Sequence, residues 1–90
     1  MSVHAVVYKK NNCPKCKITE KQLEALMPVK EEPLFEGNDE WSYKKLDKFR
    51  DQGYGSMPVV RIYDDETGER LDAWADFRAD LISKWRKTLA

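Results

Sequence analysis

Two closely spaced cysteines are the residues of this sequence best suited to chemistry. Cys13 and Cys16 are separated by Pro14 and Lys15, and the sequence holds no other cysteine. A disulfide between them would close a very short loop, and the stabilisation that a disulfide gives to a fold grows with loop length. We therefore expect redox chemistry, in which one thiolate attacks the disulfide of another molecule and the second thiol resolves the mixed disulfide.

The residues after Cys13 predict a helix that begins at this pair. Pro14 suits the first position of a helix, apolar residues repeat at helical spacing from Ile18 to Leu26, and Pro28 ends the segment. Unpaired N–H groups and the helix dipole stabilise an anion at a helix N-terminus. A free cysteine has a pKa of about 8.5, so this placement favours the thiolate of Cys13.

Lysines surround the cysteine pair, and no acidic residue stands among them in the sequence: Lys9, Lys10, Lys15 and Lys17. Their charge is expected to lower the pKa of Cys13 further and to attract acidic partners at low salt. Lysines alone usually mark only a solvated face. We expect Cys13, at the exposed start of the helix, to be the nucleophile and Cys16, within the first turn, to be the resolving thiol.

A zinc site and an unreactive pair are the alternative interpretations of the cysteines. Zinc normally takes four ligands, and the only other candidate nitrogen ligand is His4, within an expected strand. The shortage of ligands favours redox chemistry over metal binding, so no metal site is predicted. The lysine-rich setting beside a loop argues against an unreactive pair.

The segment Met57-Pro58-Val59 is the second local signal. A proline directly before an apolar strand cannot sit in the centre of a hydrogen-bonded ladder without cost. A cis bond between Met57 and Pro58 would place a tight turn there. A trans proline opening an edge strand is the commoner arrangement, and only the combination with the cysteine motif favours the cis form.

Length and composition limit the function classes. The chain has 90 residues, of which 41% are hydrophobic and 36% charged, and we treat residues 1–90 as one domain. Sixteen Lys and Arg balance 16 Asp and Glu, which disfavours a general nucleic-acid binder. No apolar run approaches the ~18 residues that span a bilayer, and Val3–Tyr8 is too short for a signal sequence. Two cysteines are few for a secreted domain of this size, so we expect a cytoplasmic protein.

The apolar pattern alternates between strand and helix. The resulting order predicts an α/β fold, a four-stranded mixed sheet flanked by three helices, in which the first strand–helix–strand unit pairs in parallel. The expected strands are Val3–Tyr8, a weaker one around Lys30–Leu34, Val59–Tyr63 and Arg70–Trp74, the last two joined by a turn. The later helices are expected after Gly37-Asn38-Asp39, with Trp41, Leu46 and Phe49 on one side and Gly53 at the end, and around Leu81, Ile82, Trp85 and Leu89.

Three segments together resemble a known family: Cys13-Pro14-Lys15-Cys16, Met57-Pro58-Val59-Val60 and Trp74-Ala75-Asp76-Phe77-Arg78. They are similar to the glutaredoxin-like branch of the thioredoxin fold, and most of all to the NrdH-redoxins. The similarity extends from Val3 to Trp85. It implies a thioredoxin fold and a dithiol–disulfide redox protein that donates electrons to class Ib ribonucleotide reductase.

The sequence departs from the NrdH-redoxin pattern at several positions. In the last segment Trp74, Phe77 and Arg78 match, whereas Ala75, Asp76 and Ala79 differ. Plain core packing is the alternative interpretation of Trp74 and Phe77. Pro14 resembles glutaredoxins instead, and Lys15 replaces the residue usual in either family. Glutaredoxins hold glutathione with a glycine pair and an acid after the last strand. Asp72-Ala73-Trp74 offers no glycine pair, although Asp76 could stand in for the acid.

The resemblance therefore implies recycling by thioredoxin reductase, with electrons from NADPH and no cofactor besides the redox disulfide. Ala73 and Trp74 are expected to obstruct glutathione. The implied partners are thioredoxin reductase and ribonucleotide reductase or other disulfide-containing proteins, with no nucleic acid or membrane, and the protein is expected to be monomeric. A glutathione-dependent glutaredoxin or a general protein disulfide reductase remains the alternative. The residues expected to bind partners are Lys10, Pro14, Lys15, Met57, Pro58, Trp74, Phe77 and Arg78.

Overall fold

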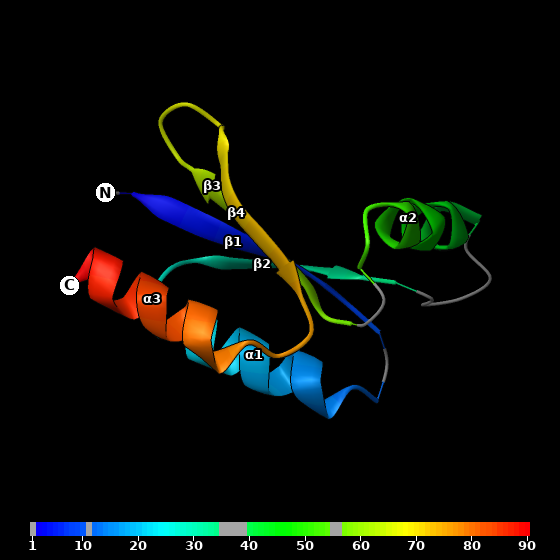
Figure 1. Ribbon diagram of the computed structural model, residues 1–90, viewed down its shortest axis with the longest axis horizontal. Helices are drawn as coiled ribbons and strands as arrows, with labels where there is room; N and C mark the ends of the chain where they lie inside the picture. Colours follow the sequence, from blue (N-terminus) through cyan, green and yellow to red (C-terminus); the bar gives the residue numbers. More distant parts are fainter. Residues whose placement is uncertain (1, 11, 35–39, 55–56) are drawn as a thin grey trace.

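A computed structural model describes residues 2–10, 12–34, 40–54 and 57–90, with the backbone alone at 40–43 and 46. These residues form a four-stranded mixed sheet and three helices, which confirms the predicted architecture (Figure 1). The elements in chain order are β1 (Val3–Lys9), α1 (Pro14–Glu24), β2 (Val29–Pro33), α2 (Glu40–Asp51), β3 (Val59–Asp64), β4 (Arg70–Ala75) and α3 (Ala79–Leu89).

The strands lie in the order β2-β1-β3-β4. β1 pairs in parallel with β2, and α1 makes the crossover between them, as the apolar pattern predicts. β3 pairs antiparallel with β1 and with β4. Gly68, with a φ of 74°, lies in the turn between β3 and β4, where a residue without a Cβ adopts the left-handed conformation at little cost. This order places the end of β1 and the start of β3 at the same edge of the sheet.

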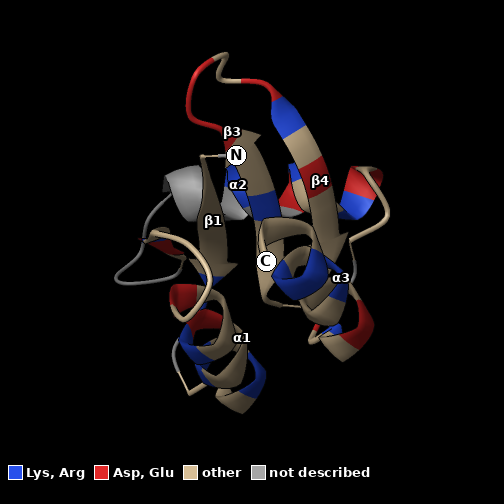
Figure 2. Cartoon of the chain, turned by 90° about the vertical axis from the view of Figure 1, so that its left-hand side faces the viewer, with Lys and Arg blue, Asp and Glu red and all other residues tan. Residues whose placement is uncertain are grey.

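Helices α1 and α3 lie side by side along one face of the sheet, and α2 lies on the other side (Figures 1 and 2). Leu23 of α1 and Ile82 of α3 are buried between the helices and the strands, together with Trp74 of β4. The full cluster on this face is Val3, Ala5, Val7, Leu23, Met27, Val60, Ile62, Trp74, Ile82 and Trp85.

Phe49 attaches α2 to the sheet. Its side chain is fully buried, and its ring centroid lies 4.9 Å from that of Tyr8 and 6.1 Å from that of Tyr54. The Lys45 ammonium lies 5.2 Å from the centre of the Tyr8 ring, and the Arg61 guanidinium lies 5.5 Å from it. Burial raises the pKa of Tyr8. The aromatic contacts hold α2 near the end of β1.

Several element boundaries differ from the sequence expectations. β4 continues to Ala75, one residue beyond the expected strand Arg70–Trp74. α1 ends at Glu24, and the N–H groups of Leu26 and Met27 both bond to the Leu23 carbonyl in a closing turn. Gly53 follows α2 with a φ of 88°, as predicted. The expected capping segment at 37–39 and the side chains of Trp41 and Leu46 lie outside the described residues.

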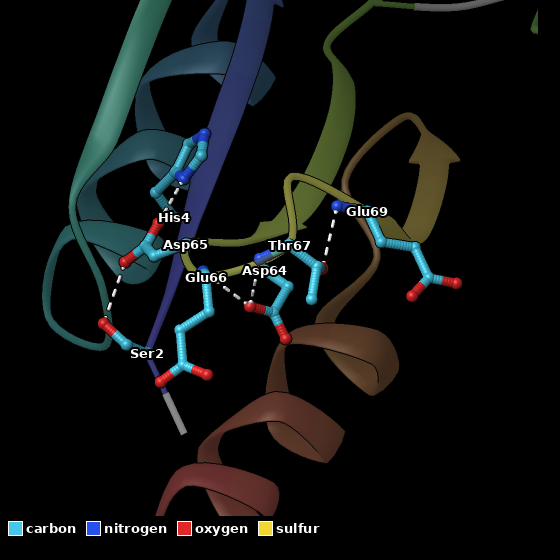
Figure 3. A network of polar contacts seen from close by, with 7 residues as sticks. All are labelled: Ser2, His4, Asp64, Asp65, Glu66, Thr67 and Glu69. Carbon is cyan, nitrogen blue, oxygen red and sulfur yellow. Dashed lines mark hydrogen bonds and ion pairs between the residues drawn. The ribbon is translucent and has the colours of Figure 1, made fainter.

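A polar network at the N-terminal start of β1 joins the beginning of the chain to the turn after β3 (Figure 3). The Asp65 carboxylate accepts a hydrogen bond from Ser2 Oγ at 2.9 Å and lies 2.5 Å from His4 Nδ1. These contacts hold the pKa of Asp65 below its usual value. Asp64 Oδ1 accepts from the Glu66 and Thr67 N–H groups. His4 therefore lies near the opposite end of β1 from the cysteines and pairs with a carboxylate there.

Charges of both signs are mixed over α1 and α3, and an acidic turn follows β3 (Figure 2). In the part of the chain that the structure describes, no helix is long and apolar enough to cross a bilayer.

Candidate active site

Cys13 and Cys16 lie at the N-terminus of α1 and are joined by a disulfide, with their Cα atoms 5.2 Å apart. Cys13 is the N-cap residue, and Pro14 is the first residue of the helix, as the sequence predicts. The Cys16 N–H donates to Cys13 Sγ at 3.2 Å, and the Lys17 N–H donates to the Cys13 carbonyl at 3.2 Å. The helix N-terminus thus presents a donor to the sulfur of the first cysteine.

Burial at the site differs from the sequence expectation. Cys13 is 6% exposed and Cys16 is 1% exposed, so Cys13 is more accessible than Cys16 by only a small margin. The expectation of an exposed Cys13 is wrong, because β1, β3 and α2 contribute apolar side chains around it. The cluster comprises Val6, Tyr8, Cys13, Cys16, Leu34, Phe49, Met57 and Val59. Pro14 and Lys15, between the cysteines, are exposed.

The bond between Met57 and Pro58 is cis, as predicted, and it immediately precedes β3. Met57 is 8% exposed and belongs to the same buried cluster as both cysteines. Pro58 is fully buried, and its carbonyl accepts a hydrogen bond from the Asp76 N–H at 2.8 Å. The start of β3 therefore connects the cysteine cluster with the segment that follows β4.

Two of the lysines expected around the pair are matched by acids from distant parts of the chain. Lys9 Nζ lies 3.1 Å from a Glu31 carboxylate oxygen and 3.6 Å from Glu20 Oε1. Lys15 Nζ lies 3.0 Å from Asp76 Oδ1. The expectation of unopposed positive charge is therefore wrong for Lys9 and Lys15.

The other two lysines, Lys10 and Lys17, are exposed, and no ion pair joins them to another described residue. Of the four lysines that flank the cysteines in the sequence, Lys10 and Lys17 are therefore the two whose charge is not paired with a described acidic residue.

The residues expected to form a partner-binding tail are separated by the fold. Trp74 is 4% exposed and packs in the core cluster shared by α1 and α3, not in the cysteine cluster. Phe77 is partly buried against the same core. Arg78 is exposed, and its guanidinium donates to both carboxylate oxygens of Asp80 at 3.0 and 2.9 Å. Of the three, only Arg78 is exposed, and its guanidinium is paired with Asp80.

Glu20 is a buried ionisable residue that the sequence analysis missed. It is 7% exposed on α1, one turn after Cys16, and its Oε1 has no hydrogen-bond partner among the described residues. Burial, together with the nearby Glu31, raises the pKa of Glu20, whereas the Lys9 contact lowers the pKa of Glu31. Its helical spacing from Cys16 is the signal that could have placed it on the inward face of α1.

No protein-family model matches the chain, and no curated protein matches its sequence. Its structure resembles that of NrdH-redoxin from Escherichia coli, with a TM-score of 0.65 and 23% identity over 90% of this chain and 92% of that one. Oxidised thioredoxin from Plasmodium falciparum gives a TM-score of 0.58 at 16% identity, covering 99% of this chain and 83% of its own. Thioredoxin from Aeropyrum pernix gives 0.55 at 18% identity, covering 97% and 75%. These likenesses show the thioredoxin fold, as predicted.

Proposed function

We propose that this chain is a dithiol–disulfide redox protein that reduces disulfides of other proteins. The observation that carries the proposal is the Cys13–Cys16 disulfide at the N-terminus of α1, in one buried cluster with Met57. A bridge over so short a loop adds little to stability, so exchange chemistry is its better use.

The reaction begins from the reduced pair. The Cys13 thiolate attacks one sulfur of a substrate disulfide, forms a mixed disulfide and releases the other sulfur as a thiolate. Cys16 then gives its proton, through solvent, to the released substrate thiolate and attacks Cys13 Sγ, which releases the second substrate sulfur as a thiolate. Two electrons have passed to the substrate, and the protein is left with the Cys13–Cys16 disulfide. The N–H groups at the start of α1 stabilise the Cys13 thiolate before attack.

Within this class we propose an NrdH-redoxin-like role, in which class Ib ribonucleotide reductase is the electron acceptor and thioredoxin reductase, supplied by NADPH, is the donor. The three matching segments of the sequence support it. The Escherichia coli NrdH-redoxin that this fold resembles is described as a glutaredoxin-like protein with a thioredoxin-like activity profile. A monomeric cytoplasmic protein fits this role.

A glutathione-dependent glutaredoxin is the second candidate, because Pro14 is the residue that glutaredoxins have at this position. The side chain of Trp74 is buried, so it does not obstruct glutathione in the way expected from the sequence. Two backbone donors near the site are instead already occupied: the Asp76 N–H by the Pro58 carbonyl at 2.8 Å, and the Phe77 N–H by Asp76 Oδ1 at 2.7 Å. A glutathione carboxylate would have to displace these bonds.

A recycling assay tests the proposal. The oxidised protein is offered NADPH with thioredoxin reductase or NADPH with glutathione and glutathione reductase, and NADPH oxidation is followed. We expect steady oxidation with thioredoxin reductase and slow oxidation with glutathione. An equal or faster rate with glutathione would promote the glutaredoxin candidate, and no reduction by either system would refute both.

A further inference from the structure

An ion pair connects the residue between the two cysteines with the segment that follows β4. Lys15 Nζ lies 3.0 Å from Asp76 Oδ1, and the side chains are 60% and 39% exposed. Lys15 is on the first turn of α1, whereas Asp76 lies between the last strand and the last helix. The fold therefore brings a carboxylate to the one lysine that stands inside the redox motif.

Asp76 is held firmly in this position. Its φ is 71°, a left-handed conformation that is uncommon for residues other than glycine and that Asp and Asn tolerate best. Its N–H donates to the Pro58 carbonyl at 2.8 Å, and its Oδ1 accepts from the Phe77 N–H at 2.7 Å. The Lys15 ammonium and the Phe77 N–H lower the pKa of Asp76, so the carboxylate is ionised at neutral pH.

We propose that Asp76 is a positioning residue that withholds the charge of Lys15 from Cys13 and thereby sets the redox balance of the cysteine pair. The inference rests on the proposed dithiol chemistry. Reduction of the disulfide takes up two electrons and one proton, and it leaves a thiolate on Cys13 and a thiol on Cys16. A nearby ammonium stabilises that thiolate and so favours the reduced form. When Asp76 pairs with Lys15, part of this stabilisation is lost, and the protein becomes a stronger reductant.

The remaining ionisable groups near Cys13 do not reproduce this arrangement. Lys10 and Lys17 flank the motif in the sequence, and Tyr8 and Tyr54 pack in or against the cysteine cluster. Arg78 pairs with Asp80 at 2.9 Å. Among the described residues, Asp76 is the one whose carboxylate contacts a lysine within the motif.

The test is a double-mutant cycle read by thiolate titration and by redox equilibration of the purified protein. Asn also tolerates the left-handed conformation, so Asp76→Asn removes the charge and leaves the backbone unstrained. We expect Asp76→Asn to lower the pKa of Cys13 by roughly half a unit, because the Lys15–Asp76 ion pair is exposed and its effect is small. The redox equilibrium should shift toward the reduced form of the cysteine pair, which makes the protein a weaker reductant. Lys15→Gln should shift both quantities in the opposite direction.

The double variant separates an effect through Lys15 from a direct effect of the Asp76 charge. In the Lys15→Gln background, Asp76→Asn should change neither the thiol titration nor the redox equilibrium. An equal shift in both backgrounds would overturn the proposal, as would no shift in the single variant. Asp80→Asn is the matched control, because it removes a carboxylate from a nearby ion pair that does not involve the motif, and it should leave the titration unchanged.

These measurements need no partner protein. If the recycling assay fails while the cycle gives the expected shifts, the proposed function fails and the role of Asp76 stands. If recycling succeeds and the cycle shows no dependence on Lys15, only the role of Asp76 is refuted.

Discussion

The backbone N–H of Cys16 donates a hydrogen bond to Cys13 Sγ at 3.2 Å, which makes the two cysteines chemically unequal. A donor aimed at the Cys13 sulfur stabilises negative charge there when the bridge opens. Cys16 is 1% exposed and lies inside the first helical turn. The geometry therefore favours Cys13 as the attacking thiolate and Cys16 as the resolving thiol.

The two serine variants should consequently behave differently. Cys16→Ser leaves Cys13 free to attack but removes the resolving thiol, so we expect it to accumulate a mixed disulfide with a substrate disulfide. Cys13→Ser should form none. Mass spectrometry of the trapped adducts is the measurement, and treatment with a reductant is the control that releases them. An adduct on Cys16 in the Cys13→Ser protein, with none in the other variant, would reverse the assignment.

A second prediction separates packing from partner binding at Trp74. The side chain is 4% exposed in the core, and its Nε1 has no hydrogen-bond partner among the described residues. Trp74→Ala should therefore lower the free energy of unfolding by about 3–5 kcal/mol. Trp74→Phe keeps an aromatic ring and loses no hydrogen bond, so we expect a cost near 1 kcal/mol and an unchanged rate of reduction by thioredoxin reductase.

Arg78→Gln is the matched comparison for the Trp74 variants. Its side chain is exposed, so the free energy of unfolding should change by less than about 0.5 kcal/mol. If Arg78 contacts the reductase, its loss slows the reaction without a change in stability. A Trp74→Phe protein with normal stability and a much slower reaction would show that Trp74 reaches the partner after all.

The contrast between Cys13 and Trp74 shows what the sequence could predict. The cysteine spacing, Pro14 and the helical apolar repeat are local features, so they located the helix start correctly. Burial of Cys13 and Trp74 depends on which strands and helices pack around them, and no local pattern contains that information. The same holds for the ion pair between Lys15 and Asp76, because these two residues lie far apart in the sequence and only the fold brings them together.

Glu20 and Glu31 share the Lys9 ammonium, and we predict opposite effects of pH on stability from them. The pKa of Glu20 is raised in the folded protein, so its contribution to stability is present below its unfolded pKa and is lost as the pH rises through the folded value. The pKa of Glu31 is lowered, so its contribution is present above its unfolded pKa and is lost as the pH falls.

Thermal unfolding of two glutamine variants between about pH 4 and pH 7 tests this difference. As the pH rises, only the unmodified protein must ionise the buried Glu20 carboxyl, so it loses stability relative to Glu20→Gln. The Tm of the variant minus the Tm of the unmodified protein should therefore increase by a few degrees from the low to the high end of this range. For Glu31→Gln the same difference should fall. If the Tm difference changes with pH in the same direction for both variants, the surroundings do not shift the pKa values of Glu20 and Glu31 in opposite directions.

The last prediction concerns Lys10 and Lys17, which are exposed near the cysteines. If they attract acidic partners, removing either charge should slow the reduction of an acidic disulfide peptide by roughly twofold at low salt, and the effect should vanish when added salt screens the charges. Lys21→Gln is the matched control, because Lys21 is an exposed lysine in the last turn of the same helix. Stopped-flow measurement of the second-order rate constant with acidic and basic peptides decides the matter. The hypothesis fails if the Lys10 or Lys17 variant reduces the acidic and the basic peptide equally slowly. It also fails if Lys21→Gln slows the reduction of the acidic peptide as much as those variants do.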